Sequence, residues 1–162
     1  MIIFGANTDA VGAQLERLTR RLLEERGYRN IAVDTIGEGG NEIDVLGEHP
    51  SHIPSNLTSR RLIAECKAWA SPIALPDWLK FLGKVFVEEA KLGSEVDGLF
   101  VALSGVNGAV RGNYDSLRQR KSHITLLDGE TLTSELSRVF NIPRVEEIVE
   151  VLKRQTPRQY TL

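Results

Sequence analysis

The chain has 162 residues, 41% hydrophobic and 26% charged, which suits one globular domain with a single core. Its formal net charge of -2 excludes a basic field over the whole molecule, so a nucleic-acid partner would need a local basic patch. One cysteine excludes an internal disulfide, and the opening residues lack a secretory signal or a membrane-spanning stretch. We therefore expect a cytoplasmic protein without a membrane partner. Residues 1–162 are predicted to form a single domain, with a core at about 8–135 and a C-terminal helix at about 143–155.

The first predicted element is a helix from about Thr8 or Asp9 to Arg26, ended by Gly27. Its apolar stripe recurs at intervals of four, three and four residues, at Val11, Leu15, Leu18 and Leu22. Glu16 lies beside this stripe. Periodicity favours a surface glutamate at this position, and the alternative is a carboxylate that leans over the edge of a sheet. Arg17, Arg20 and Arg21 are open to the same two readings, a solvated face or a phosphate-facing one.

Three strands are predicted next, at 31–35, 41–46 and 62–67. A glycine-rich turn with Gly37, Gly39 and Gly40 joins the first two. The segment 47–60 contains two prolines and several small polar residues, and it is predicted to be a surface loop. His49 and His52 lie in it without a cysteine nearby, so we expect solvent-exposed histidines rather than a zinc site.

The second half alternates helices with apolar strands, a pattern typical of a mixed sheet flanked by helices. Strands are predicted at 98–103 and 124–127, and helices at 76–92, 108–121, 130–140 and from Pro143 onward. The helix at 76–92 is expected to bury Trp78, Leu79, Leu82, Phe86 and Ala90. Its lysines, Lys80, Lys84 and Lys91, are expected to point outward, with a pocket-facing Lys84 as the alternative.

The helix at 108–121 carries a local excess of positive charge. Between Gly108 and Ser122 one acid, Asp115, stands against four basic residues: Arg111, Arg118, Arg120 and Lys121. Charged helices are usually solvated, but in a nucleic-acid-binding protein such a segment supplies phosphate contacts. These four residues are therefore the candidates for contacts with a DNA backbone.

Charged residues interrupt two strands where apolar side chains are expected. Glu65 and Lys67 project from the same face of their strand, and Asp44 reaches the same point if its strand pairs with theirs. Two carboxylates supply hard oxygen ligands for Mg²⁺, here beside an ammonium group. The alternative is an ion pair on a solvated edge strand.

Four stretches between about residues 11 and 135 carry a resemblance to a known family. They are Gly12–Leu18 followed by Gly27-Tyr28, the turn and strand Gly39–Asp44, the strand Ala64–Lys67, and the segment Ile124–Leu132. In this order they resemble the catalytic domain of Mrr-like, type IV restriction endonucleases within the PD-(D/E)xK nuclease superfamily. The resemblance implies an α/β protein with a restriction-endonuclease-like three-layer α/β/α fold around a central mixed sheet.

The same resemblance implies a Mg²⁺-dependent endodeoxyribonuclease, with Mn²⁺ able to substitute. Asp44, Glu65 and the backbone carbonyl of Cys66 would bind the metal, Lys67 would position or activate the attacking water, and Glu16 would be the outlying acidic residue. DNA is the implied substrate. Because the net charge is slightly negative and a duplex cut on both strands needs two sites, we expect the chain to act as a homodimer or beside a recognition partner protein.

One departure from the family keeps other functions open. Many Mrr-like enzymes carry Gln at the position of Glu65, whereas Glu gives the triad shared with Holliday junction resolvases. A junction resolvase is therefore an alternative to a duplex endonuclease. A DNA-binding or scaffolding module that retains the fold without activity is the other alternative.

Overall fold

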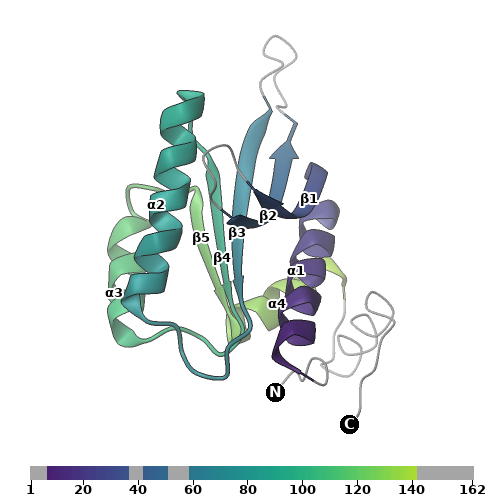
Figure 1. Cartoon of the computed structure of the whole chain (residues 1–162), viewed down its shortest axis with the longest axis vertical. Coiled ribbons are helices and arrows are strands. Elements are labelled where there is room, and N and C mark those ends of the chain that lie inside the picture. Colours follow the sequence, from purple (N-terminus) through teal and green to yellow (C-terminus); the bar gives the residue numbers. More distant parts are fainter. Residues whose placement is uncertain (1–6, 37–41, 51–58, 142–162) are drawn as a thin grey trace.

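The computed structural model describes residues 7–36, 42–50 and 59–141, which form a five-stranded sheet with helices on both faces (Figure 1). The elements in chain order are α1 (Thr8–Glu25), β1 (Arg29–Ile36), β2 (Glu42–His49), β3 (Arg60–Lys67), α2 (Leu75–Leu92), β4 (Asp97–Ala102), α3 (Gly108–Leu117), β5 (Ile124–Asp128) and α4 (Gly129–Val139).

The sheet is mixed, and its strand order follows the chain from β1 to β5. β1, β2 and β3 pair antiparallel, whereas β3, β4 and β5 pair parallel. Parallel neighbours need a crossover connection, and here α2 and α3 supply the two crossovers. The carboxyl ends of β3, β4 and β5 therefore lie along one edge of the sheet.

Two apolar layers enclose the sheet, and alternate residues of β3 face each of them. Leu62, Ala64 and Cys66 pack on the side of α1 and α4, where the helices bury Leu15, Leu18, Leu22, Leu132 and Leu136. Ile63 packs on the opposite side, against a cluster that includes Trp78, Phe81, Val85, Phe100 and Ile124. The three-layer α/β/α arrangement with a central mixed sheet is thus confirmed, as is the predicted stripe of α1.

The structure corrects the predicted loop at 47–60. β2 continues through His49 and β3 begins at Arg60, because Gly47, Glu48 and His49 pair with Leu62, Arg61 and Arg60. These cross-strand pairs outweigh the turn tendency of Gly47. His49 is partly buried, and its ring meets that of Tyr28 edge to face with centroids 5.0 Å apart, so it is not a free loop histidine.

The buried face of α2 also differs from the prediction. Phe81 and Val85 are buried beside Trp78 and Leu82, whereas Leu79 and Phe86 are 49% and 41% exposed and Ala90 is exposed. Both sets have helical spacing, so periodicity alone did not identify which of two neighbouring stripes faces the sheet.

Some predicted features fall outside the described residues. They are the glycine-rich turn, His52 and the helix expected at about 143–155. A single domain over the full length therefore stays a prediction. Among the described helices, none combines the length and the apolar composition that crossing a membrane requires.

Candidate active site

The site begins where β2 and β3 separate. Their ladder ends at the pair Val45 and Ala64, while β2 goes on pairing with β1 through Ile43 and Glu42. At this fork the Asp44 carboxylate takes the place of a backbone acceptor, because its Oδ2 accepts a hydrogen bond of 2.7 Å from the N–H of Cys66. The side chain of Asp44 is thereby fixed at the point where the sheet opens.

Glu65 lies on β3 beside this fork and is held by two lysines. It is only 4% exposed, and its Oε1 lies 2.7 Å from the Nζ of Lys67. Its Oε2 lies 2.5 Å from the Nζ of Lys84, which reaches in from α2. Burial by itself raises the pKa of Glu65, but the two lysines outweigh it and the pKa is lowered. Glu65 is therefore an ionised carboxylate at neutral pH.

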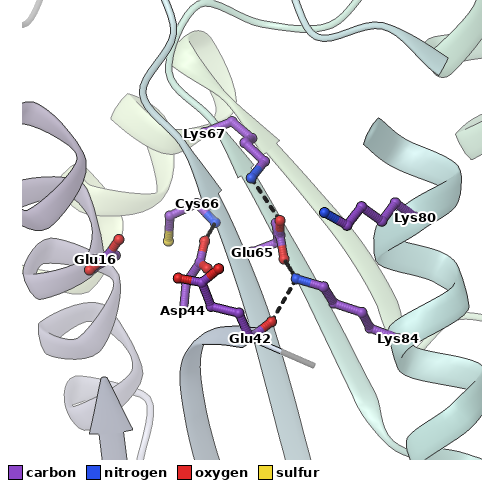
Figure 2. A pocket seen from close by; sticks show the side chains of 8 residues that line it. All are labelled: Glu16, Glu42, Asp44, Glu65, Cys66, Lys67, Lys80 and Lys84. Carbon is purple, nitrogen blue, oxygen red and sulfur yellow. Dashed lines mark hydrogen bonds and ion pairs between the residues drawn. The ribbon is translucent and has the colours of Figure 1, made fainter. Parts of the chain in front are cut away.

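A cavity of about 390 Å³ lies over these residues. It is lined by Glu16, Glu42, Asp44, Glu65, Cys66, Lys67, Lys80 and Lys84 (Figure 2). α1 contributes Glu16 on one side, α2 contributes Lys80 and Lys84 on the other, and the two strands lie between them. The structure thus brings Asp44, Glu65 and Lys67 to one place with Glu16 at its border, as the sequence led us to expect.

Negative charge accumulates on the α1 side of the cavity. Burial, followed by the nearby charges of Asp34 and Asp44, raises the pKa of Glu16 to about 7. Burial also raises the pKa of Asp44, although the hydrogen bond from Cys66 opposes this. A cation placed among these groups would relieve both effects, because opposite charge favours the ionised carboxylate.

The Lys67 ammonium keeps its charge in the cavity. Burial alone would lower the pKa of Lys67, but its hydrogen bond and ion pair with Glu65 outweigh burial and raise it. Lys67 is therefore an ammonium group at neutral pH and a hydrogen-bond donor, not a free amine. In this arrangement it is suited to positioning an oxygen atom rather than to removing a proton.

The donor set of the cavity matches the oxygen ligands that Mg²⁺ prefers. The Lys67 carbonyl accepts from the N–H of Leu103 on the β4 side of the strand. Since successive carbonyls of a strand alternate in direction, the Cys66 carbonyl points to the β2 side, the side on which the Cys66 N–H donates to Asp44. No cluster of three His, Cys, Asp or Glu side chains in the described part of the chain is arranged to bind a metal, so Asp44 and Glu65 would need backbone or water oxygens beside them.

The thiol of Cys66 is not a candidate metal ligand. Its Sγ donates to the Thr19 hydroxyl at 3.3 Å on the α1 side, and burial raises the pKa of the thiol well above its usual value. A protonated thiol is a poor metal ligand. Cys66 therefore offers its backbone, not its side chain, to the cavity.

Sequence reasoning undervalued the α2 side of the cavity. Of the two orientations expected for Lys84, outward or facing the pocket, the structure shows the second. Its side chain is only 10% exposed, and it donates to Glu65 and, at 2.7 Å, to the carbonyl of Glu42. Its spacing of three from Phe81 and four from Glu88, both buried, places it at the border of the buried stripe. That spacing was the available signal. Lys80 and Glu42, which also line the cavity, were not proposed as site residues.

The four predicted phosphate contacts lie elsewhere. None is among the described residues that line the cavity. Arg111 forms an ion pair with Asp128, Lys121 lies 3.6 Å from Glu89, and Arg118 stacks near the Tyr114 ring. Their contact with DNA, like that of Arg120, stays a prediction.

Comparison with known proteins identifies the family to which the chain belongs. The sequence model of the restriction endonuclease family Mrr_cat matches residues 9–136, which include α1 apart from its first residue, every element from β1 to β5 and most of α4. The chain therefore belongs to this family of restriction endonucleases. No curated protein matches it.

Three solved structures share the fold. The DNA modification-dependent restriction endonuclease AspBHI matches with a TM-score of 0.64 at 11% identity, over 95% of this chain and 41% of that one. The MspJI restriction endonuclease in complex with a 27-mer oligonucleotide matches with a TM-score of 0.57 at 16% identity, over 93% and 33%. A protein of unknown function, AF1548, gives 0.56 at 19% identity, over 89% and 78%. The chain thus spans about two fifths of AspBHI and one third of MspJI.

Proposed function

We propose that this protein is a Mg²⁺-dependent endonuclease that hydrolyses phosphodiester bonds of DNA. The observation that carries the proposal is the meeting of Asp44, Glu65 and Lys67 at one cavity in a chain of the restriction endonuclease family. Two carboxylates with an adjacent ammonium are the groups that a metal-assisted hydrolysis needs.

Asp44, Glu65 and the Cys66 carbonyl are the proposed metal ligands. A divalent ion bound there supplies Lewis acidity, which stabilises the negative charge that develops on a phosphoryl oxygen. The protein contributes the preorganisation: the hydrogen bond from the Cys66 N–H fixes Asp44, and Lys67 fixes Glu65. Mn²⁺, which also prefers oxygen ligands, is expected to substitute for Mg²⁺.

Lys67 is the proposed positioning group for the attacking water. As an ammonium it donates a hydrogen bond to the water oxygen and adds positive charge where negative charge develops. Glu16, across the cavity on α1, is the proposed outlying acid. Burial and the neighbouring carboxylates raise the pKa of Glu16 to about 7 without a metal, and a bound cation would favour its ionised form.

DNA as substrate is supported by the family and by MspJI, whose structure contains an oligonucleotide. The net charge of -2 leaves one copy of the chain few phosphate contacts, so recognition of a particular sequence or modification is proposed to involve a partner protein or a further copy. Arg111, Arg118, Arg120 and Lys121 remain the proposed phosphate contacts outside the cavity.

Plasmid cleavage tests the proposal. Supercoiled DNA is incubated with the protein in Mg²⁺, Mn²⁺ or EDTA, and Lys67→Ala is assayed in parallel with Lys91→Ala, which changes a lysine outside the cavity. We expect nicking or linearisation in either metal, none in EDTA, and a loss of at least a hundred-fold for Lys67→Ala. Cleavage in EDTA, or full activity of Lys67→Ala, would contradict the assignment.

Other DNA substrates separate the proposed duplex endonuclease from the two alternative functions, a junction resolvase and an inactive binding module. A branched four-way junction cut in preference to linear duplex would favour a junction resolvase. DNA binding without cleavage in any metal would favour a module that has lost activity.

A further inference from the structure

The ammonium of Lys84 is almost buried, which is an unusual position for a lysine. It donates to Glu65 Oε2 at 2.5 Å and to the backbone carbonyl of Glu42 at 2.7 Å, and the side chain is 10% exposed. These two acceptors come from β3 and from the beginning of β2. Lys84 therefore ties α2 to both strands at the fork where Asp44 is fixed, as Figure 2 shows.

One of these contacts involves the Glu65 carboxylate, around which the metal site is proposed. Glu65 has two carboxylate oxygens, and each one is paired with a lysine, Oε1 with Lys67 and Oε2 with Lys84. The positive charge of Lys84, like that of Lys67, acts to lower the pKa of Asp44. The cavity thus already holds two ammonium groups at Glu65, and both of them favour the ionised form of Asp44.

The ion pair between Lys84 and Glu65 stabilises the metal-free protein but opposes the binding of a cation. A buried carboxylate without a partner is costly, so Lys84 stabilises the fold by neutralising Glu65. A divalent ion at Glu65 has to take Oε2 from Lys84 or accept a nearby ammonium, and each possibility weakens metal binding. The same side chain therefore has opposite effects on folding and on metal affinity.

We propose that Lys84 is a built-in competitor for the divalent cation, a positioning residue that holds Glu65 until a metal ion displaces it. This inference rests on the proposed metal site. It adds a role for a residue on α2 that stands apart from the Asp44, Glu65 and Lys67 set. Release of Oε2 leaves Lys84 bound to the Glu42 carbonyl, so the ammonium stays beside the cavity.

Lys84→Met tests the competition directly, because methionine keeps the unbranched apolar length without the charge. The matched control is Lys80→Met, one helical turn away, where the lysine lines the same cavity but makes no ion pair with any residue in the described ranges. Mn²⁺ and Mg²⁺ binding are measured by calorimetry, and thermal unfolding is followed in EDTA. DNA is absent from both measurements.

Lys84→Met is expected to bind Mn²⁺ about ten-fold more tightly than the unmodified protein and to unfold at a temperature lower by roughly 5–10 °C in EDTA. Lys80→Met is expected to change affinity by less than about three-fold, since it removes charge but releases no carboxylate. An equal gain in metal affinity in both variants would mean that loss of any lysine charge at the cavity has this effect, and it would overturn the proposal. Weaker binding by Lys84→Met would overturn it too.

A second measurement does not depend on a folded variant. In the unmodified protein with ¹³C-labelled lysine, NMR signals of the Lys84 ε-carbon are followed during a Mg²⁺ titration. Displacement predicts a shift for Lys84 that saturates with metal binding, and a much smaller one for Lys80. An unchanged Lys84 signal while calorimetry records binding would overturn the proposal. If the unmodified protein bound no divalent ion at all, the proposed function itself would fail.

Discussion

At the scale of single residues, Glu16 gives the site its clearest dependence on pH. Its pKa rises from 4.5 to about 7 on folding, so the folded protein binds this proton more tightly than the unfolded chain. The contribution of Glu16 to the free energy of unfolding is therefore full below about pH 4.5 and is lost as pH rises through about 7.

Replacing Glu16 with Gln removes this loss. In EDTA, we expect Glu16→Gln to be more stable than the unmodified protein at pH 8, by on the order of 1 kcal/mol once solvent screening of a partly exposed group is allowed for. The difference should shrink toward zero at pH 5. Denaturant unfolding across this range measures it, with Glu25→Gln, an exposed position on the same helix, as control. Parallel pH profiles for Glu16→Gln and the unmodified protein would show that the cavity does not hold the Glu16 proton.

At the scale of elements, the packing of α2 on β4 depends on a glycine. A Cβ at Gly98 would lie 2.9 Å from Ile124 Cδ1, 3.0 Å from Val85 Cγ2 and 3.1 Å from Phe81 Cζ. Gly98→Ala is expected to lower the free energy of unfolding by about 1–3 kcal/mol, because three packed side chains have to move. Gly83→Ala is the matched control, since its Cβ would meet nothing within 4 Å on the exposed side of α2. There we expect a gain of about 0.5–1 kcal/mol from helix propensity. Similar effects at both positions, measured by urea unfolding, would contradict the packing described here.

The same elements show what the sequence could and could not reveal. Charge within the β3 strand identified Glu65 and Lys67, because a carboxylate inside an apolar run is costly unless it has a partner. Periodicity identified α1 correctly, since its apolar stripe has no competing neighbour. In α2 two adjacent stripes are apolar, and only tertiary packing decides that Phe81 rather than Leu79 is buried. For the same reason the sequence left the orientation of Lys84 open: its partner Glu65 is distant in sequence, and the two meet only when α2 packs on the sheet.

At the scale of the whole molecule, charge limits how tightly the isolated chain can bind DNA. The net charge is -2, and two of the three lysines at the cavity are engaged by Glu65. With two or three phosphate contacts, the slope of log K against log salt should be about -2 to -3, and a dimer should double it. Binding over a salt series, with sedimentation to fix the oligomeric state, tests this expectation. A monomer that binds duplex tightly with a steep slope would contradict it.

Asp44 and Glu65 are proposed to bind a divalent cation through oxygen atoms, and calorimetric titration measures this binding. Asp44→Asn keeps an oxygen that can accept from the Cys66 N–H but removes the charge, and Asp34→Asn is the control. Asn suits position 34, because the residue there has a positive φ of 52°. We predict that the unmodified protein and Asp34→Asn bind Mg²⁺ and Mn²⁺ in preference to Zn²⁺, and that Asp44→Asn binds both at least ten-fold more weakly. The same affinity in Asp44→Asn as in the unmodified protein would contradict this assignment, as would tighter binding of Zn²⁺ through His49 and His52.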